Sequence, residues 1–259
     1  MNGKSLVVYS LGIKLMVLIF IVALVWGHGL ISQRWFNPLA SRDDIFEELS
    51  NKNFPVDTRG EFGQTGLMIA IIKGDLGLVK AFLEHGASLD IHISDAADYR
   101  QGYMPLHLAL DCFNERPDEK EIIKYMLEFA KKKNIPLKPI VDGKDTFGNR
   151  PVHLVLAIDN PPDRMEMFKL LYNYGADLNA QNNDGNTMLH RTVFFHDMLW
   201  AGMVLNTYNK EIDPSIKNNE GLTVKDLAKK LAQGDMLELL CAKKRWPCTS
   251  REQQGLVWE

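Results

Sequence analysis

The segment from Gly148 to Asn179, GNRPVHLVLAIDNPPDRMEMFKLLYNYGADLN, has the pattern of a helix, a turn, a second helix and a glycine exit. Pro151 favours the first turn of a helix, where the missing backbone N–H loses no hydrogen bond. After a polar break at 160–163, apolar residues recur at the spacing of one helix face, at Met167, Phe168, Leu170, Leu171 and Tyr174. Gly175 suits the left-handed cap that ends such a helix. Because two short helices cannot cover their own apolar faces, the segment predicts a unit that is stable only when stacked on similar units.

Four other stretches repeat this unit, and each copy begins at a glycine. The leading glycines are Gly63, Gly102, Gly148, Gly185 and Gly221. The copies carry the motifs Thr65-Gly66-Leu67-Met68, Met104-Pro105-Leu106-His107, Arg150-Pro151-Val152-His153, Thr187-Met188-Leu189-His190 and, less regularly, Thr223 with Leu227-Ala228. This pattern of T-P-L-H, a leucine-rich second helix and G-A-D-x-N resembles the ankyrin repeat over residues 60–240. The resemblance implies an all-α, ankyrin-repeat α-solenoid of about five helix-turn-helix repeats joined by β-turn connections.

The repeats are expected to start near residues 61, 100, 146, 183 and 219. Their leading glycines are 39, 46, 37 and 36 residues apart, against about 33 in the family. Every interval therefore carries an insertion, and the largest follows Gly102. There the polar stretch 114–118 lengthens the turn between the helices, and 131–136 lacks the glycine exit. The fifth copy reads as a decayed terminal cap. The domain as a whole is expected over 41–240, with a helix at 41–50 capping its start and a tail at 241–259.

The first 40 residues have a different composition from the repeats. After a short segment at 1–10, residues 11–31 form an apolar run long enough to cross a bilayer, and 32–40 form a short linker. The run predicts one transmembrane helix that stays attached as a signal-anchor, with Lys14 near its end. The alternative is a cleaved secretory signal. Lys4, Lys14 and the amino terminus slightly outnumber Arg34 and Arg42, which favours a single-pass protein with its N-terminus inside and the repeats outside, on the periplasmic side in a bacterium. Cleavage would instead give a soluble secreted or periplasmic protein.

No catalytic or cofactor chemistry is indicated by the sequence. The net charge of −3 gives no general attraction for nucleic acid. Phosphate-binding, nucleophile-elbow and zinc motifs are absent, so neither an enzyme nor a cofactor is expected. His107, His153 and His190 hold the same place in their own repeats, where the resemblance implies a structural hydrogen bond in the turn and first helix. Met104 and Arg150 replace the family's threonine, so two of these bonds must use another partner or be lost.

The three cysteines are too few for a fold built on disulfides. Cys112 is expected in a first helix, as a small buried or half-buried residue. Cys241 and Cys248 could close a disulfide that pins the tail if the domain is exported, and the alternative is two free thiols.

A surface for binding another protein remains as the function. The resemblance places such contacts at turn tips and at exposed positions of the first helices, on the concave face. The positions that match are Phe62, Gln64, Ile72, Lys73, Arg100, Gln101, Tyr103, Asp111, Phe147, Asn149, Ile158, Asn183, Asn186, Phe194, Phe195, Glu220 and Leu222. Because aromatic side chains often anchor interfaces, Phe62, Tyr103, Phe147 and Phe194 are predicted to form one binding stripe.

The sequence therefore predicts a non-enzymatic, membrane-anchored protein that mediates protein–protein interaction. If it faces a periplasm, it could restrain a partner there as an immunity or protective protein. The alternative is a secreted, soluble ankyrin effector that acts on host proteins.

Overall fold

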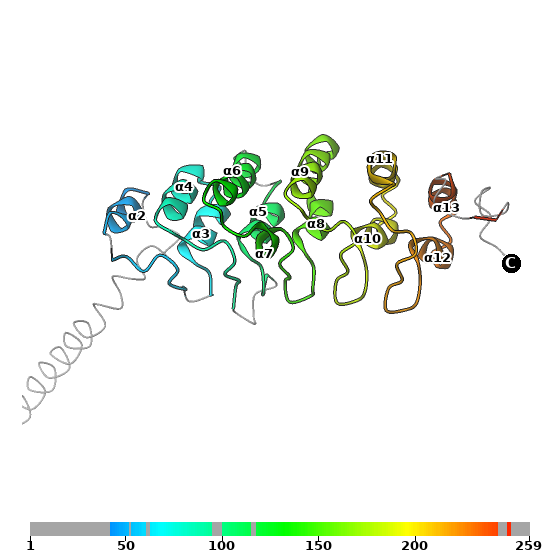
Figure 1. Ribbon diagram of the computed structural model, residues 1–259, viewed down its shortest axis with the longest axis horizontal. Coiled ribbons are helices and arrows are strands. Elements are labelled where there is room, and N and C mark those ends of the chain that lie inside the picture. The colour runs from blue at the N-terminus through cyan, green and yellow to red at the C-terminus, as the bar shows by residue number, and fades with distance from the viewer. Residues whose placement is uncertain are drawn as a thin grey trace, which may run out of the picture.

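The computed structural model describes residues 42–51, 53–60, 63–94, 100–114, 118–242 and 248–249 of the 259-residue chain. These residues form a row of paired helices with a row of loops along one side (Figure 1). The helix layer next to the loops holds α3 (Gly66–Ile72), α5 (Pro105–Asp111), α8 (Pro151–Leu154), α10 (Met188–Phe194) and α12 (Val224–Lys230). The outer layer holds α2 (Arg42–Leu49), α4 (Leu76–Glu84), α6 (Glu119–Lys132), α9 (Pro161–Asn173), α11 (Met198–Tyr208) and α13 (Gly234–Cys241). The predicted all-α solenoid is confirmed.

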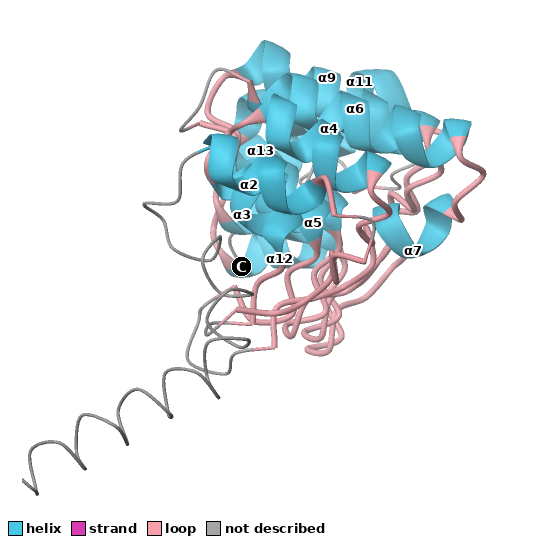
Figure 2. Cartoon of the chain, turned by 90° about the vertical axis from the view of Figure 1, so that its left-hand side faces the viewer, coloured by secondary structure: helices cyan, strands magenta, loops and turns pink. Residues whose placement is uncertain are grey.

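The pairs α3–α4, α5–α6, α8–α9, α10–α11 and α12–α13 are repeats 1 to 5. Figure 2 shows the row end-on, with the helices stacked above a bundle of loops. The helix α2 lies where the sequence predicts a cap for the start of the stack, and its Ile45 and Leu49 are buried. Each repeat therefore covers an apolar face of its neighbour, as the unit requires.

Each inner helix follows an extended N-cap residue. The backbone N–H of this residue and the backbone N–H of the third helical residue both need a hydrogen-bond partner. In repeat 4, the Thr187 hydroxyl oxygen accepts from the backbone N–H of His190 at 3.3 Å, which caps the helix. Repeats 2 and 3 lack the threonine, and there the backbone N–H of Met104 and Arg150 donates to the Nδ1 atom of the histidine three residues on, at 3.4 and 3.1 Å. Repeat 4 has the same bond, from the Thr187 backbone N–H to His190 Nδ1 at 3.3 Å, so repeats 2 and 3 keep this bond and lack only the threonine hydroxyl.

The same histidines also join one repeat to the next. The other ring nitrogen, Nε2, donates across the stack to a backbone carbonyl of the following loop. These bonds are His107 to Asn149 at 3.1 Å, His153 to Asn186 at 3.2 Å and His190 to Leu222 at 3.1 Å. All three rings are fully buried. The predicted structural role is present, but it extends beyond the histidine's own turn, since each ring ties two repeats together.

The leading glycines form the turns of the loop row. Gly148 has φ +74°, and a Cβ there would lie 2.7 Å from the backbone nitrogen of Asn183 in the next loop. Neighbouring loops come this close because they bond to each other. The Asn183 amide donates to the Thr146 carbonyl at 2.9 Å, and the Asn219 amide donates to the Asn183 carbonyl at 2.8 Å. The absence of a side chain at Gly148 thus permits the close, hydrogen-bonded spacing of the loops.

The long interval after Gly102 contains an additional short helix, α7 (Leu137–Val141). Its Ile140 and Val141 are buried, so the insertion adds to the core. The glycine exit that α6 lacks is supplied by Asn134, which takes the left-handed conformation at φ +55°. Asparagine tolerates this conformation better than most residues do.

Repeat 5 forms a complete helix pair although its motif departs from that of the other copies. Asp226 stands where repeats 2 to 4 have histidine, and its carboxylate accepts from the Thr223 hydroxyl at 2.7 Å. The same carboxylate accepts from the Thr223 backbone N–H at 3.2 Å, which completes a capping box. Cys241, the last residue of α13, is joined to Cys248 in a disulfide.

The core runs the length of the stack between the two helix layers. Trp200 of α11 is 1% exposed and packs edge-on against Phe168 of α9, with ring centroids 5.4 Å apart. Phe168 also meets Tyr208 at 5.1 Å. These rings fill the space between the outer helices of repeats 3 and 4.

The predicted anchor at 11–31 lies outside the described residues. Among the helices that are described, none combines the length and the apolar character that a membrane crossing needs.

Candidate functional site

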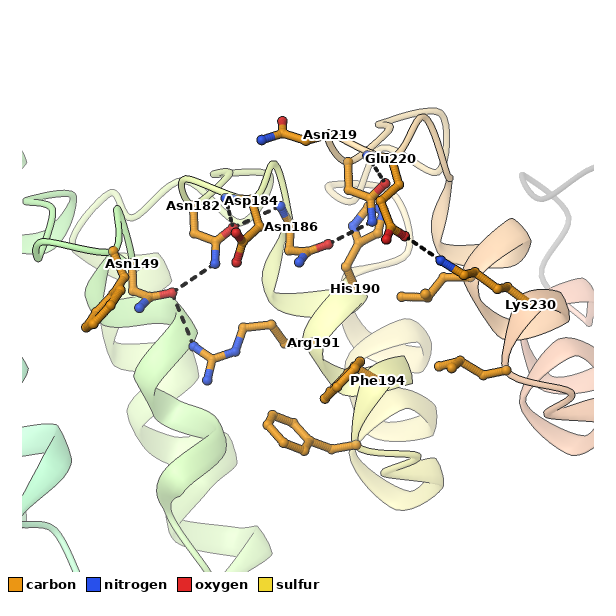
Figure 3. A pocket seen from close by; sticks show the side chains of 15 residues that line it. Asn149, Asn182, Asp184, Asn186, His190, Arg191, Phe194, Asn219, Glu220 and Lys230 are labelled. Atoms are coloured by element: carbon orange, nitrogen blue, oxygen red, sulfur yellow. Dashed lines mark hydrogen bonds and ion pairs between the residues drawn. The ribbon is translucent and has the colours of Figure 1, made fainter.

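A groove with a volume of about 580 Å³ lies against repeats 4 and 5. Loop tips form one side of it and the inner helices α10 and α12 form the other (Figure 3). It is lined by Phe147, Asn149, Asn182, Asp184, Asn186, His190, Arg191, Phe194, Phe195, Asn218, Asn219, Glu220, Leu227, Lys230 and Leu231.

Three aromatic side chains in this groove are unusually exposed. Phe147 is 58% exposed, Phe194 64% and Phe195 59%. Phe194 and Phe195 meet edge to face with ring centroids 5.5 Å apart. They stand at the end of α10, which stops because His196 adopts φ +53°. His196 is held by a 2.8 Å contact from its Nε2 atom to the Asp235 carboxylate of repeat 5, so the aromatic pair is fixed at a helix terminus.

The loop side of the groove is stiffened by asparagine side chains. The Asn182 side-chain oxygen accepts from the backbone N–H groups of Asp184 and Asn186, both at 3.0 Å. Its side-chain amide donates to the Asn149 side-chain oxygen of the preceding loop at 3.2 Å. Asn218 repeats the link one loop later by donating to the Asn186 side-chain oxygen at 3.0 Å. The loop side is therefore organised before any partner arrives.

The groove also carries charge of both signs. Arg191 of α10 reaches across to Asn149, where its Nη1 atom donates to the side-chain oxygen at 3.3 Å (Figure 3). Burial lowers the pKa of the Arg191 guanidinium, although nearby acids oppose that effect. At the far end, Glu220 pairs with Lys230 at 2.9 Å. Asp184 is exposed at its loop tip.

Six of the residues predicted to contact a partner are brought together here. They are Phe147, Asn149, Asn186, Phe194, Phe195 and Glu220. Asn183 lies on the same loop row. The proposed binding role of these residues stays a prediction.

The remaining predicted contacts are distributed differently. Tyr103 is half-buried and stacks on His107 at 5.6 Å, and Ile72 and Leu222 pack against the core. Phe62 lies outside the described residues. The half-exposed polar positions at repeats 1 and 2 are Gln64, Lys73, Arg100, Gln101 and Asp111. Within the described chain, the aromatic stripe therefore reduces to the cluster in the groove.

The prediction that Ile158 contacts a partner is wrong. Ile158 is fully buried and cannot meet a partner. The first helix of repeat 3 ends at Leu154 and passes into the 3₁₀ turn η2 (Val155–Ala157), after which Ile158 is extended at φ −78° and ψ +116°. Because the helix stops early, the side chain turns into the core.

Arg191 is one of the groove residues that were not predicted from the sequence. It stands six residues after its leading glycine, where other repeats carry an aliphatic residue. These are Ile69, Leu108, Leu154 and Leu227. A charged residue at a position that is otherwise aliphatic was the available signal.

Across the part of the chain that the structure describes, His, Cys, Asp and Glu side chains do not gather into a group of three or more that could hold a metal ion. The three repeat histidines use both ring nitrogens in the bonds described above. The arrangement is one of packing, hydrogen bonding and surface contact.

Comparison with protein families gives two matches, which together span more than half of the chain. A model described as ankyrin repeats in three copies matches residues 39–139. A second, described as ankyrin repeats in many copies, matches residues 156–198.

Individual relatives agree with these matches. The chain is 27% identical over 199 residues to ankyrin repeat protein L371 of Acanthamoeba polyphaga mimivirus, which covers 69% of this chain and 23% of that protein. It is 32% identical over 99 residues to ankyrin repeat protein FPV031 of Fowlpox virus, which covers 37% of this chain and 27% of that protein. The chain thus spans about a quarter of the length of the curated relatives it matches. The crystal structure of EF0377, an ankyrin repeat protein, superposes with a TM-score of 0.60 at 24% identity, over 82% of this chain and 94% of that one.

Proposed function

We propose a protein-binding role for this chain, which belongs to the ankyrin-repeat family. Ankyrin repeats generally bind other proteins, and the stack offers a rigid surface for this. We place the contact in the groove between the loop row and α10, and we propose no catalysis there.

The observation that carries this proposal is the aromatic cluster. Phe147, Phe194 and Phe195 are each more than half exposed and line one groove. Exposing three large apolar side chains together gives up the free energy that burial would provide, about 25 cal/mol per Å². A partner that covers them recovers it, and aromatic anchors surrounded by polar groups are typical of binding hot spots.

The proposal is tested by capturing partners from the native host with the immobilised chain and then measuring affinity for the purified partner. Phe194→Ala and Phe147→Ala are each expected to weaken binding by about 2 kcal/mol. Leu199→Ala is the matched control, because Leu199 is 61% exposed but lies on α11 in the outer layer. Denaturant unfolding of each variant separates lost affinity from lost stability. Unchanged affinity in both phenylalanine variants would refute the groove as the binding surface.

We further propose that residues 11–31 anchor the chain in a membrane, with the N-terminus inside and the repeats in an oxidising space outside. The apolar run and the Cys241–Cys248 disulfide support this, since disulfides persist mainly in exported proteins. In that position the groove would restrain a partner on the outer side, as an immunity or protective protein does.

Two measurements on protein from the native host test this placement. An anchored chain stays in the membrane fraction through alkaline carbonate washing and keeps its N-terminal residues. Alkylation without reductant leaves Cys241 and Cys248 unlabelled if the repeats are exported. A soluble form that begins near His28 would refute the anchor, and two labelled thiols would refute the orientation.

A further inference from the structure

Arg191 differs from other arginines of the stack in the groups that surround its guanidinium. Three of them pair with a carboxylate of the described chain, in Arg42–Asp75, Arg150–Asp142 and Arg164–Asp197. Arg191 has instead one hydrogen bond to Asn149 at 3.3 Å and a face contact with the Phe195 ring at 5.9 Å. Within the described residues, none of the ion pairs involves it. A half-buried cation therefore faces the groove without a direct counter-charge.

The guanidinium has capacity for a further ligand. It carries five N–H donors, and the single bond to Asn149 is long for an N–H···O contact. Its partial burial reduces hydration, which lowers the pKa of the group. Since the charge is poorly solvated, an added anion gains more here than it would at an exposed lysine. The planar fork matches a carboxylate, which it can hold by two parallel bonds.

The charges nearby favour a singly charged anion. Asp145 and Asp184 lie close enough to act on Arg191 electrostatically, and both raise the pKa of the guanidinium. These acids repel a doubly charged phosphate more strongly than a carboxylate. Glu220 adds to the negative rim, although Lys230 is paired with it. A phosphorylated segment or a nucleic acid is therefore the poorer fit.

The apolar part of the groove lies beside this charge. Phe194 and Phe195 follow Arg191 within one turn of the same helix, and Phe147 lines the groove from the loop side. From this juxtaposition we propose that Arg191 selects a segment of the partner protein that presents an aspartate or glutamate next to a large apolar side chain. The inference rests on the proposed function and names the chemistry that the groove recognises.

The test selects phage-displayed random peptides on the full-length chain and then measures the affinity of the recovered peptides individually. We expect the selected sequences to carry Asp or Glu within two positions of Phe, Leu or Trp. Arg191→Gln is expected to weaken their binding by about tenfold or more, and so is Asp→Asn or Glu→Gln in the peptide. The two changes together should cost no more than either alone, because they remove the same contact. Changing the peptide leaves the protein intact, so this arm does not depend on the variant's folding.

Lys169→Gln is the control, because Lys169 is an exposed cation on α9 in the outer layer. It should leave peptide affinity unchanged. Peptides that lose affinity in Phe194→Ala but bind Arg191→Gln normally would overturn this inference and leave the proposed function standing. Peptides indifferent to both changes would overturn both. Tighter binding of a phosphoserine peptide than of its aspartate counterpart would overturn the carboxylate assignment.

Discussion

Acidification should loosen this stack through its buried histidines, and His153 allows the effect to be calculated. Burial lowers the pKa of its imidazole from 6.5 to about 4. The ring cannot take a proton without cost, because Nδ1 already accepts from the Arg150 backbone N–H while Nε2 donates to the Asn186 carbonyl. Protonation of Nδ1 would place its N–H directly opposite the Arg150 backbone N–H. The neutral ring is therefore the form that the folded state requires.

The sign and size of the effect follow from the two pKa values. Between pH 6.5 and pH 4 the unfolded chain binds the proton and the folded chain does not, so acid favours unfolding. The contribution of His153 is fully present above pH 6.5 and is lost as the pH falls toward its folded pKa. From pH 7 to pH 5 the loss amounts to about 2 kcal/mol. Burial also lowers the pKa of His107 and His190, so they act in the same direction.

The assay is urea unfolding followed by circular dichroism at pH 7, 6 and 5, for the native chain and His153→Gln. The variant should be less stable at pH 7, by about 1 kcal/mol or more for the lost bonds. It should lose less stability on acidification, so the stability difference between the two chains should shift by about 2 kcal/mol in favour of the variant from pH 7 to pH 5. His92→Gln is the control, since His92 is exposed and should leave the pH dependence unchanged. Parallel loss of stability in the native chain and His153→Gln would refute the reasoning.

Three further substitutions test the packing, each by denaturant unfolding. Gly148→Ala should destabilise the fold by roughly 2 kcal/mol, because it combines a positive φ with a clash against the next loop. It should cost more than Gly175→Ala, where φ is positive but the space is open. Equal costs would contradict the close approach of the loops. Asn218→Ala should cost about 1–3 kcal/mol by leaving two backbone N–H groups of its loop without their acceptor, while exposed Asn173→Ala should be nearly neutral. Trp200→Ala should cost about 3–5 kcal/mol, because it empties the space between α9 and α11; a loss below 1 kcal/mol would show that the outer layer repacks freely.

The repeat framework could be predicted because its signals are local. A leading glycine, a capping threonine and a second apolar run each act within a few residues, so the fold class and the helix pairs can be recognised in one sequence. The hydrogen bonds from the histidines to the following repeat could not be predicted in the same way. His153 bonds to a backbone carbonyl at Asn186, and every residue has such a carbonyl. The partner is identified by the stacking distance between repeats, which only the folded chain supplies.

Errors arose where a position was counted along the chain without knowing the helix length. Ile158 and Phe195 both stand ten residues after their leading glycine. Phe195 caps a complete seven-residue helix and is exposed, whereas Ile158 follows a four-residue helix and is buried. Asn160, Pro161 and Pro162 begin the second helix of repeat 3 almost at once, which leaves no room for a longer first one. The same distance from the leading glycine therefore gives a buried side chain in repeat 3 and an exposed one in repeat 4.

The same limit explains how much of the groove can be known from sequence. Aligning the repeats by their glycines isolates Arg191 as the one charged residue among aliphatic ones, so a reader of the sequence could have marked it. That Arg191 joins none of the ion pairs among the described residues could not be read in this way, because it depends on distances to acids in other repeats. Asp145 and Asp184 influence the guanidinium without pairing with it, whereas Arg164, 27 positions earlier, has Asp197 as a direct partner. Two arginines of one stack thus differ in function through geometry alone, since one stabilises the scaffold and the other keeps its charge free for a ligand.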